Sequence, residues 1–349
     1  MEDQAALARR FRDFGRATSK ASPLYGHLSL AIAEDPNVIE LLRVAPAPQQ
    51  IPVLLFAAVH DLLLRGLGSE LAAYYPNLTV AVAEGDPYPI FRQVALDHRE
   101  VLLQTIATRN TQTNEVGRCA YFLPVFAIVA DEVGPLAHLD VGTSAGLNLA
   151  WPKFSYRYDS QPIINSGSIV VVDCSTRGAP PLPKQLPQLA RAIGLDVAPI
   201  DVADEEAVRW LEACVWPDQP RRFSQLIAAI EIARSSPPDV RAGDAVIAVG
   251  KLIDELAEYG HPLVTTSWVL NYLGESGQRA FVAAVDEVGA RCDLSWVVAE
   301  SPAQTPGLPI PGAPDEEITV LSLVTWRRGR RVVRRLATAH PHGAWMNWE

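Results

Sequence analysis

Hydrophobic residues recur every three to four positions through most of the first 135 residues, which is the spacing of amphipathic helices. The clearest stretches are residues 6–17, 37–45, 51–66, 89–109 and 115–134. Pro36 stands where a first-turn proline is favoured, and Gly66 stands where helices commonly stop. We find no convincing strand pattern in this region. The sequence therefore predicts a helical N-terminal part over residues 1–135, which would act as a cover or lid.

From Leu136 onward the pattern changes to short runs rich in Val, Ile, Thr and aromatic residues, which are typical of strands. The runs lie at residues 136–141, 168–174, 262–270, 294–300, 318–326 and 331–339. Helical patterns lie between several of them, at residues 204–216, 221–234, 243–259 and 276–291. Strands that alternate with helices predict a mostly parallel sheet with helices on both faces. Residues 136–349 are therefore expected to form an α/β domain.

The last two predicted strands are separated by a turn-length connection at residues 327–330, which predicts an antiparallel hairpin. We expect residues 318–326 to run parallel to the main sheet and residues 331–339 to run back. His340 and His342 would then emerge at the opposite end of the sheet from the loop that follows the first strand. The proline-rich stretch 300–315 is long enough to be a lid or substrate loop.

Composition narrows the class of protein. The chain has 349 residues, 48% of them hydrophobic, which suits one large domain with an appended one. The net charge of −10 argues against a nucleic-acid partner, because that surface needs clustered Lys and Arg. The cysteines form no C-x-x-C pair, and scattered cysteines suit a reducing compartment. No signal peptide is evident and the apolar runs are short, so we expect a cytoplasmic protein without membrane contact. The sequence does not indicate an oligomeric state.

Residues 140–148, with the sequence DVGTSAGLN, lie between the first predicted strand and a predicted helix. One interpretation is the G-x-S-x-G elbow of a serine hydrolase, with Ser144 as the nucleophile. Its partners would be Asp293 or Glu300, followed by His340 or His342. That fold needs several strands before the elbow and a loop that supplies an oxyanion donor. The helical pattern upstream supplies neither, so we favour a second interpretation.

The second interpretation is a cofactor loop. Gly142 and Gly146 let the backbone turn tightly, and the free N–H groups of the following helix would face the ligand. The dinucleotide fingerprint G-x-G-x-x-G fails, because Ser144 and Leu147 replace its second and third glycines, so a pyrophosphate is not expected. An acidic residue about 20 positions later would bind ribose hydroxyls. Asp159 fits if residues 155–159 form the second strand, and Asp173 is the alternative.

The stretch LDVGTSAGLN resembles motif I of the class I S-adenosylmethionine-dependent methyltransferases, an acidic residue followed by a glycine-rich turn. The resemblance covers roughly residues 136–338. Ser144 departs from it, because the common pattern has its middle glycine there. The resemblance implies a Rossmann-like α/β sheet that binds S-adenosylmethionine. It places Asp140 near the methionine amino group, directly or through water.

The same resemblance implies roles for other residues. Residues that would wrap or contact the cofactor are Gly142, Ser144, Gly146, Asn148, Asp159 (ribose hydroxyls), Asp201 (adenine edge), Asn114 and Arg118 (methionine carboxylate). Two of these have ordinary alternatives. Asn114 could cap the helix that follows it, and Asp201 could cap the helix that starts near Asp204.

Three residues are expected near the substrate, because ligands of open α/β sheets bind beyond the carboxyl ends of the strands. Trp268 and Asn271 follow one predicted strand, and Glu300 ends the next. Trp268 could stack on a ring or be a core aromatic, and Glu300 could be a general base or cap a loop. His340 and His342 look like metal ligands, but no third ligand accompanies them, so we expect no metal.

The whole chain is also similar to a bacterial family of unknown function. The stretches that carry this similarity are residues 112–118, 144–149, 156–159, 195–202, 209–222 and 340–345. This similarity implies only a helical N-terminal part on a methyltransferase-like domain. Taken together, the sequence favours an S-adenosylmethionine-dependent transferase, a methyltransferase, that acts on a small molecule. A non-catalytic cofactor-binding or regulatory protein and a serine hydrolase are the alternatives.

Overall fold

The computed structural model describes residues 4–165, 167–302 and 318–349, and it divides into two compact units. The first, here called the helical unit, comprises Met1–Thr113 and Ala203–Ile227. The second, the sheet unit, comprises Asn114–Val202 and Ala228–Glu349. This division differs from the boundary expected at residue 135 in two ways. Residues 114–135 belong with the sheet, and a later segment returns to the helical unit.

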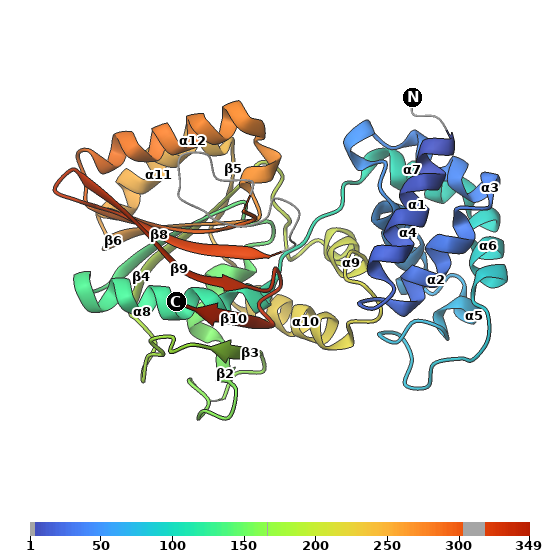
Figure 1. Ribbon diagram of the computed structural model, residues 1–349, viewed down its shortest axis with the longest axis horizontal. Helices are drawn as coiled ribbons and strands as arrows, with labels where there is room; N and C mark the ends of the chain where they lie inside the picture. The colour runs from blue at the N-terminus through green and yellow to red at the C-terminus, as the bar shows by residue number, and fades with distance from the viewer. Residues whose placement is uncertain (1–3, 166, 303–317) are drawn as a thin grey trace. The chain divides into compact units, whose positions relative to one another are not determined.

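The helical unit consists of short helices (Figure 1). Its elements are α1 (Gln4–Thr18), α2 (Pro23–Ile32), α3 (Pro36–Ile39), η1 (Glu40–Val44), η2 (Ala47–Gln49), α4 (Pro52–Leu64), α5 (Ser69–Ala72), α6 (Tyr88–Asp97), α7 (Arg99–Thr108) and α9 (Glu205–Ala213). Helix α10 (Pro220–Ser235) contains the boundary between the units at residues 227 and 228. No strand of the described residues precedes Leu136, so the prediction of a strand-free N-terminal part is confirmed for residues 4–135.

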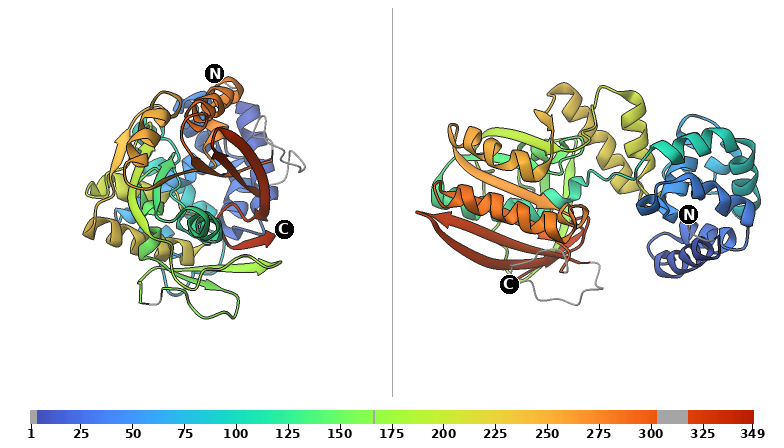
Figure 2. Two further views of the ribbon diagram at one scale, coloured as in Figure 1. Left: turned by 90° about the vertical axis from the view of Figure 1, so that its left-hand side faces the viewer. Right: turned by 90° about the horizontal axis from the view of Figure 1, so that it is seen from above.

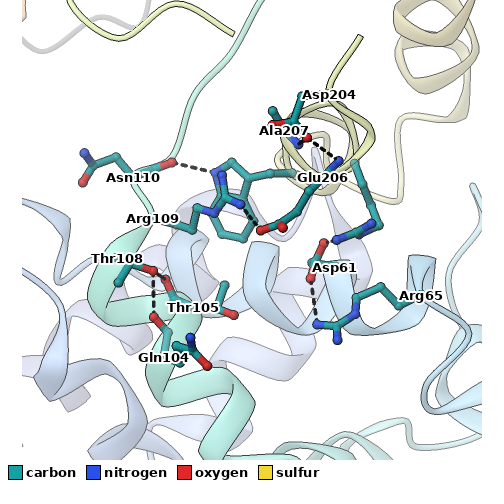
Figure 3. A network of polar contacts seen from close by, with 12 residues as sticks. Asp61, Arg65, Gln104, Thr105, Thr108, Arg109, Asn110, Asp204, Glu206 and Ala207 are labelled. Atoms are coloured by element: carbon teal, nitrogen blue, oxygen red, sulfur yellow. Dashed lines mark hydrogen bonds and ion pairs between the residues drawn. The ribbon is translucent and has the colours of Figure 1, made fainter. Parts of the chain in front are cut away.

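Helix α9 completes the core of the helical unit although it lies about 100 residues further along the chain than α7. Trp210 and Ala213 of α9 are buried in the same cluster as Phe56 of α4. The Trp210 indole Nε1–H donates to Asn110 O at 2.8 Å, and Arg209 Nε donates to the Asp61 carboxylate at 2.8 Å. Figure 3 shows the acceptors Asn110 and Asp61 of this network. Because both hydrogen bonds are partly buried, α9 is held by specific contacts as well as by apolar packing.

The sheet unit contains every described strand of the chain. Its strands are β1 (Leu136–Val141), β2 (Ser155–Tyr158), β3 (Val171–Arg177), β4 (Leu189–Asp196), β5 (Val240–Ala242), β6 (His261–Ser267), β7 (Leu294–Glu300), β8 (Thr319–Arg327), β9 (Arg330–Ala339) and β10 (Trp345–Trp348). Its helices are η3 (Val116–Arg118), α8 (Cys119–Val133), η4 (Leu147–Lys153), α11 (Ala245–Ala257), η5 (Leu270–Tyr272) and α12 (Gly274–Gly289).

The strands form one sheet in the order β2-β3-β10-β9-β8-β7-β6-β1-β4-β5. Strands β5, β4, β1, β6 and β7 are mutually parallel, and β8 is antiparallel to β7. Figures 1 and 2 show α11 and α12 along one face of this sheet and α8 on the other. The buried side chains of α11 and α12 pack on β1, β6 and β7. The expected mostly parallel sheet with helices on both faces is therefore confirmed.

The direction of the last two strands differs from the prediction. Strand β8 pairs antiparallel with β7, and β9 pairs antiparallel with β8, so β9 runs in the direction of the parallel strands. His340 follows the last residue of β9 and lies at the carboxyl end of the sheet, the same end as Ser144. The prediction failed because it assumed a crossover before β8, whereas β8 returns directly beside β7. The proposed lid or substrate loop at 300–315 lies almost wholly outside the described residues.

Within the described ranges, no helix combines the length and the hydropathy that crossing a bilayer requires.

Candidate functional site

The loop after β1 has an unusual backbone. Gly142 and Gly146 both adopt φ of 73°, and Ser144 between them adopts φ of 55°. Positive φ is uncommon for a residue with a Cβ, and a strained residue is often held at a functional site by its surroundings. The conformation of the two glycines explains why the sequence needs glycine there.

The backbone N–H groups of this loop are already used within the protein. Gly142 N and Thr143 N donate to Leu195 O at 2.7 and 3.3 Å, and Gly146 N donates to Thr143 O at 2.9 Å. Ser144 N donates to the Asp196 carboxylate at 2.7 Å. Ala145 N and Leu147 N both donate to Asn114 Oδ1 at 3.1 Å. Every N–H from Gly142 to Leu147 therefore has a protein acceptor, and the element that follows is the short 3₁₀ helix η4. The expectation of a helix whose free N–H groups face a ligand is wrong.

The space beside the glycines is also filled by protein atoms. A Cβ on Gly142 would lie 2.2 Å from Cγ2 of Val269. A Cβ on Gly146 would lie 2.6 Å from Cγ2 of Val240. Packing against the ends of β6 and β5 therefore requires these glycines, in addition to their backbone conformation.

Asp140 lies at the carboxyl end of β1 within a buried polar network. Its two carboxylate oxygens accept hydrogen bonds from Thr143 Oγ1 at 2.8 Å and from Thr265 Oγ1 at 2.7 Å. Thr265 Oγ1 in turn pairs with His138 Nε2 at 2.8 Å. Burial raises the pKa of Asp140 to about 6, although the two threonine hydroxyls and the charge of Arg118 oppose the rise. Asp140 is thus a carboxylate that titrates near neutral pH.

The segment before α8 brings two predicted residues to this loop. Asn114 is 7% exposed, and its Oδ1 caps the loop and η4 rather than the helix that follows it. Arg118 Nη1 donates to Ser267 O at 2.9 Å, at the end of β6, and its charge lowers the pKa of Asp140 and of Glu300. Asn148 points elsewhere, because its Oδ1 accepts a hydrogen bond from Cys119 Sγ at 3.5 Å. The structure therefore joins Asn114 and Arg118 to the loop.

The two acidic residues proposed for the ribose are not at this site. Asp159 follows β2, where its carboxylate accepts from Thr176 N at 3.1 Å, and Asp173 on β3 pairs with Arg157 at 3.1 Å. In the sheet order, strands β10, β9, β8, β7 and β6 lie between β3 and β1. Neither 155–158 nor 171–177 is the strand beside β1.

The strand beside β1 is β4, which the sequence did not reveal, and it ends at Asp196. Asp196 Oδ2 accepts from Ser144 N, and Oδ1 accepts from Ala198 N at 2.9 Å. Asp196 therefore occupies the position that the sequence argument gave to Asp159. The sequence does contain a signal for Asp196, because the stretch 195–202, one of those that carry the similarity to the bacterial family, begins one residue before it.

The residues expected near the substrate lie at the ends of β6 and β7. Glu300 is fully buried, and its carboxylate accepts from Val269 N at 3.1 Å and from Leu270 N at 3.3 Å. Burial raises its pKa to about 8. Trp268 has φ of 56°, and its Nε1–H donates to Thr319 Oγ1 at 2.7 Å. Asn271 is exposed. Glu300 thus caps the turn after β6. Of the two roles considered for it from the sequence, general base or loop cap, these hydrogen bonds correspond to the loop cap.

Asp201 and Ser144 are the last two of the predicted site residues. Asp201 is exposed, and Asp204, not Asp201, caps α9 by accepting from Glu206 N at 2.9 Å. Ser144 Oγ is buried and finds no hydrogen-bond partner among the described residues. Among those residues there is also no group of three His, Cys, Asp or Glu side chains placed to hold a metal ion.

Comparison with known proteins identifies the family. A family model described as "Uncharacterized protein conserved in bacteria (DUF2332)" matches residues 8–348, so the chain belongs to this family. No curated protein and no solved structure matches the chain.

Proposed function

We propose that this member of the bacterial family DUF2332 binds S-adenosylmethionine at the carboxyl ends of β1 and β4 and transfers its methyl group to a small molecule. When bound, this cofactor supplies an electrophilic methyl group on a positively charged sulfur. The residues of the sheet unit would bind and orient it.

The order of the parallel strands supports a nucleotide-type site. Counted along the chain, β1, β4, β5, β6 and β7 are the first to fifth parallel strands, and they lie in the order third, second, first, fourth, fifth. Doubly wound nucleotide-binding sheets share this order, and their ligands bind where it reverses, outside the carboxyl ends. Here the reversal lies between β1 and β6. Asp140 is the next-to-last residue of β1 and Ser267 is the last residue of β6, so the candidate site is at the position where a ligand is expected.

The observation that carries the proposal is that every N–H of the loop 142–147 is already donated to a protein acceptor. A pyrophosphate needs such N–H groups, so this loop is a poor match for a dinucleotide. The charged groups bonded at this site are the carboxylates of Asp140 and Asp196, whose oxygens can each accept a further hydrogen bond, and the guanidinium of Arg118. Acceptors favour a cationic ligand group, such as the ammonium and sulfonium of S-adenosylmethionine, over an anionic one.

Specific residues fit parts of this ligand. Asp140 would attract the methionine ammonium, and Asp196 would accept hydrogen bonds from the ribose hydroxyls. Arg118 would attract the methionine carboxylate, because a guanidinium is suited to carboxylates. Ser144 Oγ is buried and has no hydrogen-bond partner in the described part of the chain, so a ligand hydroxyl or amine at this position would satisfy it.

The serine hydrolase has one observation in its favour, the strained backbone of Ser144 at φ 55°. The N–H groups argue against it. In a nucleophile elbow the residue after the serine donates its N–H to the oxyanion. Here that residue is Ala145, and its N–H is donated to Asn114. The chain also lacks strands before β1 in residues 4–135.

Calorimetric titration with S-adenosylmethionine, S-adenosylhomocysteine and NAD tests the proposal. We expect both sulfur compounds to bind and NAD to give no heat. Binding of S-adenosylmethionine should weaken as the pH falls below about 6, because protonation of Asp140 removes the charge that attracts the ammonium. Asp140→Asn should weaken binding at pH 8 and abolish this pH dependence. Binding of NAD alone would overturn the proposal, and binding without transfer to any acceptor would favour the non-catalytic alternative.

A further inference from the structure

A chain of buried side chains leads from the middle of β1 to the candidate site. His138 Nε2 lies 2.8 Å from Thr265 Oγ1, and Thr265 Oγ1 donates to Asp140 Oδ1 at 2.7 Å. The other oxygen, Asp140 Oδ2, accepts from Thr143 Oγ1 at 2.8 Å, in the loop after β1. Each of these four residues is 3% exposed or less. Because the chain is shielded from water, its hydrogen bonds act at low dielectric and influence one another.

The direction of each hydrogen bond in this chain follows from a count of hydrogens. An ionised carboxylate only accepts, and a threonine hydroxyl carries a single hydrogen. Because Thr265 gives that hydrogen to Asp140, it accepts from His138, and neutral His138 therefore carries its proton on Nε2. Nδ1 of His138 is buried and has no hydrogen-bond partner in residues 4–165, 167–302 and 318–349. A proton on Nδ1 would be an unpaired buried N–H, which is costly, so the surroundings favour the same tautomer.

The surroundings of His138 also keep its ring neutral and in place. Burial lowers the pKa of His138 to about 3, so the ring carries no charge at neutral pH. Phe126 of α8 packs edge to face on it, with the ring centroids 5.3 Å apart. The acidic residues of α8, Asp131 and Glu132, are exposed in its last turn, and burial raises the pKa of the Cys119 thiol at its start. His138 therefore acts through a neutral N–H donor and not through a charge.

The charge state of Asp140 depends on several groups, one of which His138 controls. Burial raises the pKa of Asp140 to about 6, and the charge of Asp196 at the end of β4 adds to the rise. Two threonine hydroxyls and the charge of Arg118 oppose it, and Thr265 contributes most among them. The hydroxyl of Thr265 has this effect only while its hydrogen is directed to the carboxylate, which is the direction that His138 imposes.

We infer that His138 is a positioning residue of the candidate site, which directs the Thr265 hydrogen to Asp140 and so keeps that carboxylate charged for a cationic group of the ligand. This inference rests on the proposed function, in which that group is the ammonium of S-adenosylmethionine. His138 acts through Thr265 rather than on the ligand. A Thr265 hydroxyl released from His138 can turn and accept a hydrogen bond from the protonated carboxyl, which favours the neutral form of Asp140.

The first test follows the carboxyl carbon of Asp140 by NMR in the full chain without ligand, with Asp140→Asn to assign its resonance. His138→Leu should raise the titration midpoint by roughly half a pH unit to one unit, the shift equivalent to one hydrogen bond. Thr265→Val, which keeps the shape of the side chain, should raise it at least as much. His138→Gln keeps an N–H donor and should restore most of the wild-type midpoint. Asp173 on β3 is the internal reference and should titrate identically throughout.

A double variant separates positioning from a purely structural role. If His138 acts through Thr265, His138→Leu should shift the midpoint of Asp140 in the otherwise wild-type chain and leave it unchanged in the Thr265→Val background. Nitrogen NMR of the wild-type imidazole should show the proton on Nε2, a measurement that requires no variant to fold. Equal shifts in the two backgrounds, or a proton on Nδ1, would overturn the inference.

Calorimetry with S-adenosylmethionine then connects the charge of Asp140 to the ligand. The affinity of His138→Leu should match that of the wild type within about twofold at pH 8 and be roughly three- to fivefold weaker at pH 6, where more of its Asp140 is protonated. If S-adenosylmethionine binds and this variant has the wild-type pH profile, the inference is wrong. If the NMR midpoints shift as expected but the compound does not bind, the proposed function fails, and the assignment of His138 to that ligand fails with it.

Discussion

The carboxylate of Asp196, at the end of β4, accepts a hydrogen bond from the backbone N–H of Ser144 at 2.7 Å and so joins the two strand ends that form the candidate site. This contact leads to the first prediction. Asp196→Asn removes the charge that would accept the ribose hydroxyls, and charged hydrogen bonds contribute about 1.5–3 kcal/mol. We expect the affinity for S-adenosylhomocysteine to fall roughly tenfold or more in calorimetry.

Asp173→Asn is the matched control for this experiment. Asp173 was an alternative ribose ligand from the sequence, but it lies on β3 in an exposed ion pair with Arg157. An exposed pair contributes little to stability, so this variant should fold and bind as the wild type does. Equal losses of affinity in the two variants would contradict the assignment of Asp196.

The second prediction concerns Asn114, whose single oxygen accepts from Ala145 N and Leu147 N. Asn114→Ala leaves two buried N–H groups unpaired, and each costs about 1–3 kcal/mol. We therefore expect faster hydrogen exchange at residues 145 and 147 and a lower free energy of unfolding. Asn114→Asp keeps an acceptor and should restore most of the protection. Asn271→Ala, at an exposed residue of the same sheet end, should leave exchange at both amides unchanged. Unchanged protection in Asn114→Ala would show that the contact does not hold the loop.

Two strands of the sheet unit are predicted accurately from the sequence, and one is missed. Residues 136–141 and 294–300 were predicted with the bounds that β1 and β7 have, because continuous apolar runs mark strands buried on both faces. Strand β4 was missed because the first half of LARAIGLD is partly exposed and because Arg191 and Gly194 interrupt its apolar pattern. Without β4, the acidic residue beside the loop was assigned by distance along the chain, which led to Asp159.

Other parts of the site depend on contacts that a single sequence does not encode locally. Asn114 was picked out by its motif, but its partners lie 31 and 33 residues away. The positions of His340 and His342 depend on whether β8 runs parallel or antiparallel to β7, and the apolar pattern of a strand is the same in both directions. The return of α9 to the helical unit likewise depends on tertiary packing of Trp210, which an amphipathic pattern alone does not assign to a core.

The third prediction is a pH dependence of stability that arises from Glu300. Burial raises its pKa to about 8 in the folded protein from the ordinary value of 4.5. Between these values the folded state binds one more proton than the unfolded state, so the free energy of unfolding falls as the pH rises, by about 1.4 kcal/mol per pH unit. Glu300→Gln should remove this contribution and flatten the pH dependence of the free energy of unfolding between pH 5 and 8 in urea unfolding.

The control variant is Glu275→Gln, in an exposed pair with Arg279, which should leave the slope unchanged. A wild-type slope equal to that of Glu300→Gln would mean that Glu300 does not retain its proton in this range.

The last prediction decides between the two interpretations of GTSAG. The reversal of β9 removes one argument against a hydrolase, since His340 and His342 lie at the same end of the sheet as Ser144. Two arguments remain. Residues 4–135 contain no strand, and the oxyanion donor is missing, because Ala145 N donates to Asn114 Oδ1 and Gly146 N donates to Thr143 O. A serine without a free donor beside it gains little from attack on an acyl or phosphonyl centre. We therefore expect no labelling of Ser144 by a fluorophosphonate probe.

Ser144→Ala should weaken binding of S-adenosylhomocysteine only modestly, since one hydrogen bond contributes about 0.5–1.5 kcal/mol. Stoichiometric labelling that Ser144→Ala abolishes would instead identify Ser144 as a nucleophile, and the proposed cofactor loop would be a nucleophile elbow.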